Sequence, residues 1–347
     1  MNWSFFRSSR VVPLIAVAVF LVGTAACGTP TPAQPTSAGA GTPGPQKPLQ
    51  QLTVALDWYP WSNHTGLYMA EEMGYYKDVG LDVKLYVPSN PEDVLKLVGS
   101  GKDNFGISYE GDVLLARAEN IPVKSVAAMV QRPLNSIMTL KSSGIEHPRQ
   151  LEGKTVGYPG IPGQEAMLKT IMERDGSSID KVKLVNVGYD LVPALIGKKV
   201  DAVLGAYWVH ESILAEEQGY PVNIMKVGDW GVPNYYELVM VASEDMIKQQ
   251  PDTIKRFLWA TAKGYTKATE DPAKALDLLV KANPDTDRKM EEQGIKLLAP
   301  LWMDNVTAWG TQDKQKWENY GGWMKREKLL PDNVNPNDAF TPDLITK

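Results

Sequence analysis

The sequence predicts an α/β fold in two lobes, preceded by an export signal and a linker. From Leu52 onwards, apolar β-rich runs alternate with helical runs, which is the pattern of a parallel or mixed sheet covered by helices. This part of the chain has about 300 residues, enough for two compact lobes. After Ser243 the pattern is almost wholly helical. We therefore expect the last helices to complete one of the lobes.

Residues 1–26 have the order of an export signal. Two arginines precede an apolar run at 11–22, and four small residues separate that run from Cys27. The run is too short to span a bilayer. Cys27 is the only cysteine of the chain and stands where processing is expected, so the segment resembles a bacterial lipoprotein signal in which Cys27 carries the lipid. The alternative is cleavage without lipid, which leaves a free thiol.

Residues 27–50 follow the signal with mostly Pro, Thr, Ala, Gly and Gln and no acidic residue. Such a composition buries too little apolar surface to fold, so it predicts an extended, disordered tether between a lipid and a globular part. Beyond Cys27 no cysteine remains. Disulfides and thiolate metal sites are therefore not expected in the globular part.

The first lobe begins with a strand, a turn rich in aromatic residues and a short helix that ends at Gly74. Alternating apolar and polar residues then predict a second strand, and Asn90 and Pro91 are typical of the start of the next helix. The strand, helix, strand unit recurs up to residue 130. The expected elements are strands at 52–56, 81–87, 104–108 and 123–130, with helices at 67–73, from the cap at 89–93 to Gly99, and at 112–118.

A second series of the same units predicts the second lobe. Its expected strands are 154–158, 182–187, 202–206 and 222–227, and its expected helices are 164–174, 190–196 and 210–218. Strand-like runs at 138–141 and 236–241 are plausible crossings between the lobes. Helices expected at 251–268, 272–282 and 312–325 then complete the first lobe. The sequence thus predicts lobe 1 at 51–140 and 241–347, and lobe 2 at 141–240.

Several function classes fit the composition poorly. The formal net charge is −5 without a Lys/Arg cluster, which argues against nucleic-acid binding. The three histidines do not have zinc-site spacing, and no phosphate-loop or dinucleotide motif is present. Ser108 lies in a glycine-flanked run that is one residue too long for a hydrolase nucleophile elbow, and it fits a hydrogen-bond donor at a strand end.

The turn from Asp57 to Tyr68 is the strongest candidate for a binding site. It ends a strand and combines aromatic rings with uncharged donors and acceptors, notably Asn63 and His64. A core strand avoids that mixture, and ligands of open α/β sheets collect beyond the carboxyl ends of strands. Considered alone, Trp58 or Trp61 would also fit a buried position in the hydrophobic core. Together, these residues favour the binding of a flat polar ligand.

Two further segments are candidates in the second lobe. The run Gly157 to Gly163 follows a strand and opens a helix, so its backbone N–H groups either face a ligand or form a plain Gly/Pro turn. Tyr207 and Trp208 end a strand shortly before Glu211. Neighbours on a strand point to opposite faces, so we expect one of the two rings in the core and the other, with Glu211, in the cleft.

Several segments together resemble one protein family. They are Leu56 to Trp58, Asn63 to Tyr68, Gly74 to Tyr76, Gly80 to Val83, Gly205 to Trp208 and Val232 to Leu238. They are similar to the group that joins thiamine-pyrimidine-precursor binding proteins of ABC importers to the fungal pyrimidine-precursor synthase. The resemblance covers nearly the whole globular part. It implies a two-lobed periplasmic-binding-protein fold of type II, with a two-strand hinge and the ligand between the lobes.

The resemblance also implies which residues hold the ligand. It points to Trp58, Asn63, Tyr68, residues near Tyr158 to Gly160, and Glu211. With the aromatic segments above, the expected ligand-binding residues are Trp58, Tyr59, Trp61, Asn63, Tyr68, Tyr109, Tyr158, Gly160, Tyr207, Trp208, Glu211 and Tyr235. No catalytic residue, metal or cofactor is expected, because the synthase branch carries a cysteine-rich iron motif that this globular part lacks.

The ligand expected from these residues is riboflavin. Tyr59 and Trp61 replace small polar residues of the pyrimidine binders, and their additional ring surface suits a three-ring plate as in a related branch of riboflavin-binding lipoproteins. The alternatives are a formylaminopyrimidine precursor of thiamine and, from a different class, a pyrimidine-processing enzyme. The expected protein is a monomeric receptor that is lipid-anchored at the extracytoplasmic face of the cell membrane and delivers its ligand to an ABC permease.

Overall fold

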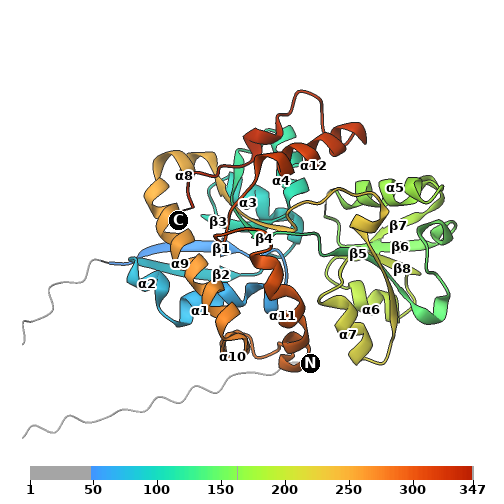
Figure 1. Cartoon of the computed structure of the whole chain (residues 1–347), viewed down its shortest axis with the longest axis horizontal. Helices are drawn as coiled ribbons and strands as arrows, with labels where there is room; N and C mark the ends of the chain where they lie inside the picture. The colour runs from blue at the N-terminus through green and yellow to red at the C-terminus, as the bar shows by residue number, and fades with distance from the viewer. Residues whose placement is uncertain (1–47, 162, 346–347) are drawn as a thin grey trace, which may run out of the picture. The chain divides into compact units, whose positions relative to one another are not determined.

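The computed structural model describes residues 48–161 and 163–345, which fold around two five-stranded sheets (Figure 1). The predicted signal at 1–26, Cys27 and nearly all of the predicted tether lie outside the described residues. The first sheet has the order β2-β1-β3-β10-β4 and the second the order β7-β6-β8-β5-β9. The prediction of an α/β fold with two lobes is confirmed, and the sheet membership of each strand now defines the lobes.

The first sheet contains strands from both ends of the described chain. Its strands are β1 (Gln50–Ala55), β2 (Leu81–Tyr86), β3 (Phe105–Ser108), β4 (Val123–Val130) and β10 (Leu238–Ser243). The strands β1, β2 and β3 are parallel, whereas β10 lies antiparallel between β3 and β4. Gln50, which was assigned to the tether, therefore already belongs to the sheet.

The second sheet is formed by one continuous stretch of chain. Its strands are β5 (Asn135–Leu140), β6 (Thr155–Tyr158), β7 (Lys183–Asn186), β8 (Ala202–Tyr207) and β9 (Val222–Lys226). Here β5 is the antiparallel strand, between β8 and β9. The predicted lobe boundaries after 140 and 240 are thus displaced, since β5 belongs wholly to the second sheet and β10 wholly to the first. The crossings lie instead just before Asn135 and just before Leu238.

Helices cover both sheets, and the last helices return to the first lobe as predicted (Figure 1, orange to red). The helices with the first sheet are α1 (Thr65–Glu72), α2 (Tyr75–Asp78), α3 (Val94–Gly99), α4 (Glu110–Ala118), α8 (Glu244–Gln249), α9 (Pro251–Glu270), α10 (Pro272–Ala282), α11 (Arg288–Trp302) and α12 (Lys314–Arg326). Those with the second sheet are α5 (Gln164–Arg174), α6 (Leu191–Ile196) and α7 (Glu211–Glu217). The sequence did not predict α11.

Close packing of α1 against α9 fixes the first lobe next to the aromatic turn. A Cβ atom on Gly264 would lie 2.1 Å from the carbonyl oxygen of Gly66, so the two helices approach as only glycine allows. The neighbouring Tyr265 is buried, and its hydroxyl donates to the carbonyl oxygen of Asn63 at 2.7 Å. This contact anchors the turn to α9.

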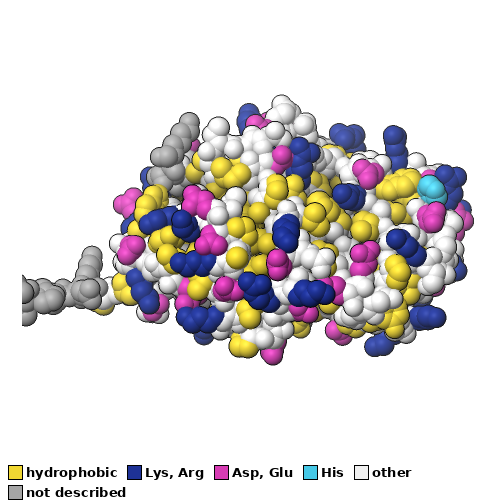
Figure 2. All heavy atoms as spheres, turned by 60° about the horizontal axis from the view of Figure 1, so that its bottom comes forward, with side chains coloured by type: hydrophobic (Ala, Val, Ile, Leu, Met, Phe, Trp, Pro, Cys, Tyr) yellow, Lys and Arg dark blue, Asp and Glu magenta, His cyan; other side chains and the backbone are white. Residues whose placement is uncertain are grey.

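The surface carries charges of both signs. Figure 2 shows acidic and basic side chains interspersed over one face. In the described part of the chain, no helix is both long and apolar enough to cross a membrane.

Candidate functional site

A small cavity lies between the two lobes at the carboxyl ends of β1 and β8. We call it the first cavity. The residues that line it are Asp57, Trp58, Trp61 and Tyr109 from the first lobe, and Pro159, Ile161, Gln164, Gly205, Tyr207 and Glu211 from the second. Because both lobes contribute walls, a ligand bound here contacts both of them.

Aromatic rings form much of the wall. Trp58 is half-buried, and Trp61 and Tyr207 are almost completely buried. The ring centroids of Trp61 and Tyr207, which come from opposite lobes, are 5.7 Å apart. The indole N–H of Trp61 is buried and has no hydrogen-bond partner among the described residues. The cavity therefore offers ring faces together with a free donor nearby.

The aromatic turn is held in shape by a buried set of hydrogen bonds around Asp57. One carboxylate oxygen lies 3.0 Å from Nε2 of His64, and the other accepts from the hydroxyl of Tyr109 at 3.2 Å. The backbone N–H of Trp61 donates to Nδ1 of His64 at 3.4 Å. Since Nδ1 accepts, Nε2 carries the proton that is donated to Asp57. These bonds position Trp58 and Trp61 at the cavity wall.

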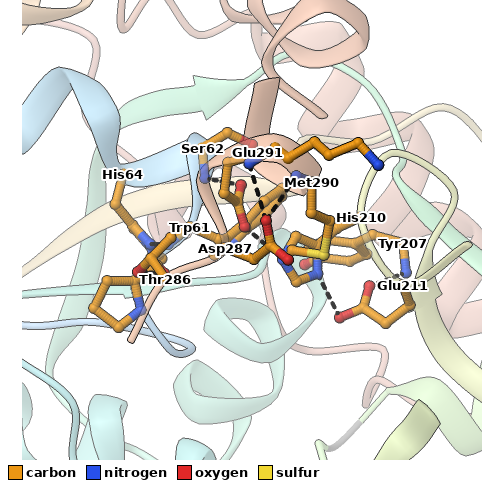
Figure 3. A network of polar contacts seen from close by, with 12 residues as sticks. Trp61, Ser62, His64, Tyr207, His210, Glu211, Thr286, Asp287, Met290 and Glu291 are labelled. Atoms are coloured by element: carbon orange, nitrogen blue, oxygen red, sulfur yellow. Dashed lines mark hydrogen bonds and ion pairs between the residues drawn. The ribbon is translucent and has the colours of Figure 1, made fainter. Parts of the chain in front are cut away.

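A second polar network runs from the first lobe to Glu211, and Figure 3 shows its members. Asp287 caps the start of α11, the helix that carries Glu291. One oxygen of Glu291 accepts from the backbone N–H of Ser62 at 2.6 Å, and the other lies 3.0 Å from Nε2 of His210. Nδ1 of His210 lies 3.1 Å from Glu211. The network therefore joins α11 of one lobe to the cavity wall of the other.

The two carboxylates of this network favour the protonated, positively charged form of His210. Burial by itself lowers the pKa of the imidazole, but the carboxylates of Glu211 and Glu291 outweigh burial and raise the pKa to about 10. The other oxygen of Glu211 accepts from the backbone N–H of Tyr207 at 2.7 Å. Glu211 is thus held in a single orientation at the cavity wall.

A second small cavity adjoins the first. The two share Tyr109, Ile161 and Gln164 as walls. The remaining walls of the second cavity are Gly111, Asp112, Asn135, Gly163, Met167, Tyr235, Glu237 and Tyr320. The Gln164 side chain lies between the two cavities, where its N–H donates to the Asn135 side chain at 3.3 Å.

Glu237 connects the two crossings between the lobes. Its carboxylate accepts from the backbone N–H groups of Leu134 and Asn135 and from the hydroxyl of Tyr235. Burial raises the pKa of Glu237 to about 7, although these donors oppose the shift. The outgoing and returning chain segments are thereby joined at the hinge beside the second cavity.

Five of the expected ligand-binding residues line the first cavity, and one more lines only the second. Those in the first cavity are Trp58, Trp61, Tyr109, Tyr207 and Glu211. Tyr109 also borders the second cavity, where Tyr235 lies. Tyr207 ends β8 and lines the first cavity, whereas Trp208 follows the strand and lies beneath Lys226, whose ammonium is 3.8 Å from the Trp208 ring centroid. Trp208 is half-buried, packs against the hydrophobic core and does not line the first cavity.

The other expected residues lie away from both cavities. Tyr158 and Gly160 line a wider, more open gap between the lobes. Asn63 is fully buried, and neither polar atom of its side-chain amide has a hydrogen-bond partner among the described residues, so its role as a ligand contact stays a prediction. Tyr68 is buried with its hydroxyl 3.4 Å from the Asn283 side chain. Tyr59 is 55 % exposed and packs against Tyr189, with ring centroids 4.6 Å apart. The expectation that Tyr59 adds ring surface to the ligand site is therefore not met, since its ring points to solvent.

Some wall residues of the cavities, and Glu291 of the polar network, were not predicted as site residues. Asp57 had a usable sequence signal, because a carboxylate that directly follows an apolar strand lies at the ligand-binding edge of an α/β sheet. Gln164 is the first residue of a predicted helix, behind the Gly/Pro run, and that position gave a weaker signal. Glu291 gave none, since it is 229 residues away from its partner Ser62.

Metal ligands do not gather at either cavity. Among residues 48–161 and 163–345, no group of three or more His, Cys, Asp or Glu side chains is placed to hold a metal ion. The carboxylates of Asp57, Glu211 and Glu237 are instead engaged by histidine, tyrosine or backbone donors.

Comparison with known proteins gives relatives over nearly the whole chain. The chain is 34 % identical over 339 residues to a formylaminopyrimidine-binding protein of Halalkalibacterium halodurans, with 96 % of this chain and 98 % of the relative covered. It is 28 % identical to the riboflavin-binding protein RibY of Chloroflexus aurantiacus, covering 97 % of both. It is also 28 % identical to a 4-amino-5-hydroxymethyl-2-methylpyrimidine phosphate synthase of Saccharomyces cerevisiae, covering 83 % and 86 %.

A solved structure supports the fold. The alkanesulfonate-binding protein SsuA from Xanthomonas axonopodis pv. citri, solved with bound MOPS, superposes with a TM-score of 0.67 at 12 % identity, covering 85 % of this chain and 99 % of that one. The fold is therefore the two-lobed periplasmic-binding-protein fold of type II that the sequence predicts. The model of the NMT1/THI5-like family matches residues 61–275. With this match and a relative of 34 % identity along almost its entire length, the chain belongs to the NMT1/THI5-like family.

Proposed function

We propose that this protein is the ligand-binding component of an ABC importer and that it captures a formylaminopyrimidine precursor of thiamine. The formylaminopyrimidine-binding relative supports this ligand, because it shares 34 % of its residues with the chain along almost its full length. The binding-protein fold supports capture between two lobes. This choice reverses the ranking expected from sequence, which placed riboflavin first.

The observation that carries the proposal is the lining of the first cavity, which combines aromatic rings and carboxylates from both lobes. Trp61 and Tyr207 offer ring faces from the two lobes. Asp57 and Glu211 place carboxylate oxygens at the wall, where they suit the amino group of an aminopyrimidine.

Binding rather than catalysis is the better proposal for these groups. The Asp57 carboxylate already contacts His64 and Tyr109, and the Glu211 carboxylate contacts His210 and the backbone of Tyr207. Such bonds hold a side chain in one orientation, which serves recognition. The yeast relative named as a synthase keeps a pyrimidine-processing enzyme as the alternative from another class.

Riboflavin is the second candidate, and Trp61 is the residue that favours it. The Trp61 ring lines the first cavity at a position where the pyrimidine binders have a small polar residue. The relative named as a riboflavin-binding protein is similar along its whole length but at 28 % identity. Because Tyr59 lies outside the cavity, only one of the two additional rings supports this candidate.

We further propose that Cys27 carries a lipid, so that a monomeric receptor remains at the extracytoplasmic face of the cell membrane beside its permease. Cys27 lies outside the described residues, and this part of the proposal follows from the order of residues 1–27. With a lipid at one end and a globular part beyond residue 50, the tether between them keeps the receptor close to the membrane surface.

Calorimetric titration of the purified globular part with each ligand tests the proposal. We expect one formylaminopyrimidine to bind per chain, and riboflavin to bind more weakly or not at all. Tight riboflavin binding with quenched flavin fluorescence would favour the second candidate. Turnover of a pyrimidine into a new product would instead favour the enzyme, and failure of every one of these ligands to bind would contradict the proposal.

A further inference from the structure

The second cavity holds two hydrogen-bond acceptors that no donor of the described residues satisfies. Asp112 of α4 is 7 % exposed and lines this cavity. No donor from residues 48–161 or 163–345 forms a hydrogen bond with its carboxylate. The side-chain oxygen of Gln164, which is 4 % exposed, is also buried without a partner. A buried acceptor without a partner is costly in an empty protein, so the Gln164 oxygen indicates a donor that arrives with a ligand. The Asp112 carboxylate at the same cavity is a second acceptor available to that donor.

The lining of the second cavity narrows the kind of donor that fits the two acceptors. The described residues that line it include two carboxyl groups, Asp112 and Glu237, but neither Lys nor Arg. Glu237 is already satisfied by backbone and tyrosine donors. A metal ion is not supported, since the described residues form no cluster of three or more ligands. The missing partner must therefore bring hydrogen-bond donors, and the carboxyl groups favour a donor group that carries positive charge.

Asp112 and Gln164 face the cavity from opposite lobes. A Cβ atom on Gly163, directly before Gln164, would lie 3.3 Å from the Asp112 carboxylate, so Asp112 of the first lobe lies beside the start of α5 in the second. Gln164 also borders the first cavity. A ring in the first cavity can thus extend one short arm past Gln164 towards Asp112.

We propose that the second cavity is a subsite for a primary ammonium arm of the ligand, held by Asp112 and the side-chain oxygen of Gln164. This inference rests on the proposed function and extends it: the receptor takes aminopyrimidines with a free aminomethyl group as well as the formylated compound. Burial, and secondarily the negative charge of Glu237, raises the pKa of Asp112 well above its ordinary value in the empty protein. An arriving ammonium supplies the positive charge that this carboxyl lacks.

Three pyrimidines that differ only at the 5-methylene substituent test the proposal by calorimetry at pH 7. They are 4-amino-2-methylpyrimidine with a 5-aminomethyl, a 5-hydroxymethyl or a 5-formylaminomethyl group. We expect the aminomethyl compound to bind at least about tenfold more tightly than the neutral hydroxymethyl compound, the preference of a charge-assisted hydrogen bond. Asp112→Asn should reduce this preference to less than about threefold, and Gln164→Met should reduce it in part.

Glu119→Gln is the matched control, because it removes the same charge from an exposed position at the end of α4. It should keep the full preference for the aminomethyl compound. Binding of the hydroxymethyl compound by each variant shows that the variant is folded. Equal binding of the aminomethyl and hydroxymethyl compounds by the wild-type protein, or an unchanged preference in Asp112→Asn, would overturn the subsite alone. Failure of all three compounds to bind would overturn the subsite together with the proposed function.

Discussion

The imidazole of His210, in the second lobe, lies 3.0 Å from the carboxylate of Glu291, in the first lobe. Their side chains are only 12 % and 1 % exposed, so water screens the pair weakly. Glu291 also holds the backbone of Ser62 beside Trp61, and His210 contacts Glu211. Separation of the lobes has to break this contact. The pair therefore stabilises the arrangement in which the first cavity is enclosed.

Replacing Glu291 with Gln keeps the shape of the side chain and removes its charge. We expect Glu291→Gln to weaken ligand binding by about 1–3 kcal/mol, because a buried partner of His210 is lost. Calorimetry measures the affinity, and small-angle scattering should show less compaction on ligand addition. Glu292→Gln is the control, since Glu292 forms only surface pairs with Arg288 and Lys296 and should change affinity by less than about 0.5 kcal/mol. Equal effects of the two variants would contradict this role of Glu291.

Stability should fall with rising pH because of His210. Its pKa is raised from 6.5 to about 10 by Glu211 and Glu291, which outweigh the opposing effect of burial. A folded-state pKa above the unfolded value means that the stabilisation is complete below pH 6.5 and is lost as pH rises towards 10. Urea unfolding at pH 6.5, 8 and 10 gives the free energy of unfolding. Between pH 6.5 and pH 10 it should fall by about 1–3 kcal/mol more in wild type than in His210→Gln. If the free energies of unfolding of the two proteins changed in parallel with pH, this role of His210 would be refuted.

Trp61 and Tyr59 form a matched pair of rings on one turn. Trp61 is 2 % exposed and lines the first cavity, whereas Tyr59 is 55 % exposed and does not. Trp61→Ala should weaken ligand binding by about 1–3 kcal/mol through lost stacking and burial. Tyr59→Ala should leave the affinity within about 0.5 kcal/mol. Titration of both variants with formylaminopyrimidine measures the two affinities. A larger loss of affinity in Tyr59→Ala than in Trp61→Ala would show that the ligand binds outside the first cavity.

Gly205 is needed for the placement of Gln164. At a φ of +93°, a Cβ atom on Gly205 would lie 2.7 Å from the Gln164 side-chain nitrogen. Gly219 has a φ of +83° and open space around its Cβ position. Both alanine variants should lose about 1 kcal/mol of stability from backbone strain, but only Gly205→Ala should also weaken ligand binding, by about 1 kcal/mol or more. Thermal unfolding and calorimetry separate the two effects, and identical affinities would exclude a role for this contact.

The lipid at Cys27 is tested in cells. If Cys27 is the anchor, the processed wild-type protein should sediment with membranes, and Cys27→Ser should be released or accumulate as precursor. Fractionation followed by mass analysis of the N-terminus gives the result. A Cys27→Ser protein that is processed and still sediments with membranes would rule out this anchor.

The order of strands and helices was predictable because apolar residues recur in most elements with the period of a strand or a helix. The strand at 123–130 and the helix at 164–174 have the predicted bounds. Helix α11 was missed because Gly294 and Pro300 interrupt its pattern, and its burial comes from tertiary contacts that the sequence does not display. The missed helix carries Glu291, so the network between the lobes was missed with it.

The sequence predicted which segments form the candidate site, but not every residue that lines it. The sequence predicted that Tyr207 and Trp208 are neighbours on one strand and point to different faces. In the structure the strand ends at Tyr207, which borders the first cavity, and Trp208 lies beneath Lys226. Asn63 was expected to contact the ligand because it is polar within an aromatic turn; it is fully buried, with an amide that has no partner among the described residues, and the expectation stays a prediction. Such differences depend on the packing of α9 and α11, which lie about 200 residues further along the chain.

The position of β10 in the first sheet has a consequence for the order of folding. The strand partner of β4 is β10, and its isolated bridges reach Gly310 and Phe340. Every one of these partners is synthesised after residue 237, whereas the second sheet is complete once Lys226 has emerged. During synthesis the second lobe can therefore fold as a unit while β4 still exposes unpaired edges. The first lobe, which contains the N-terminal strands, is then the last part of the receptor to form.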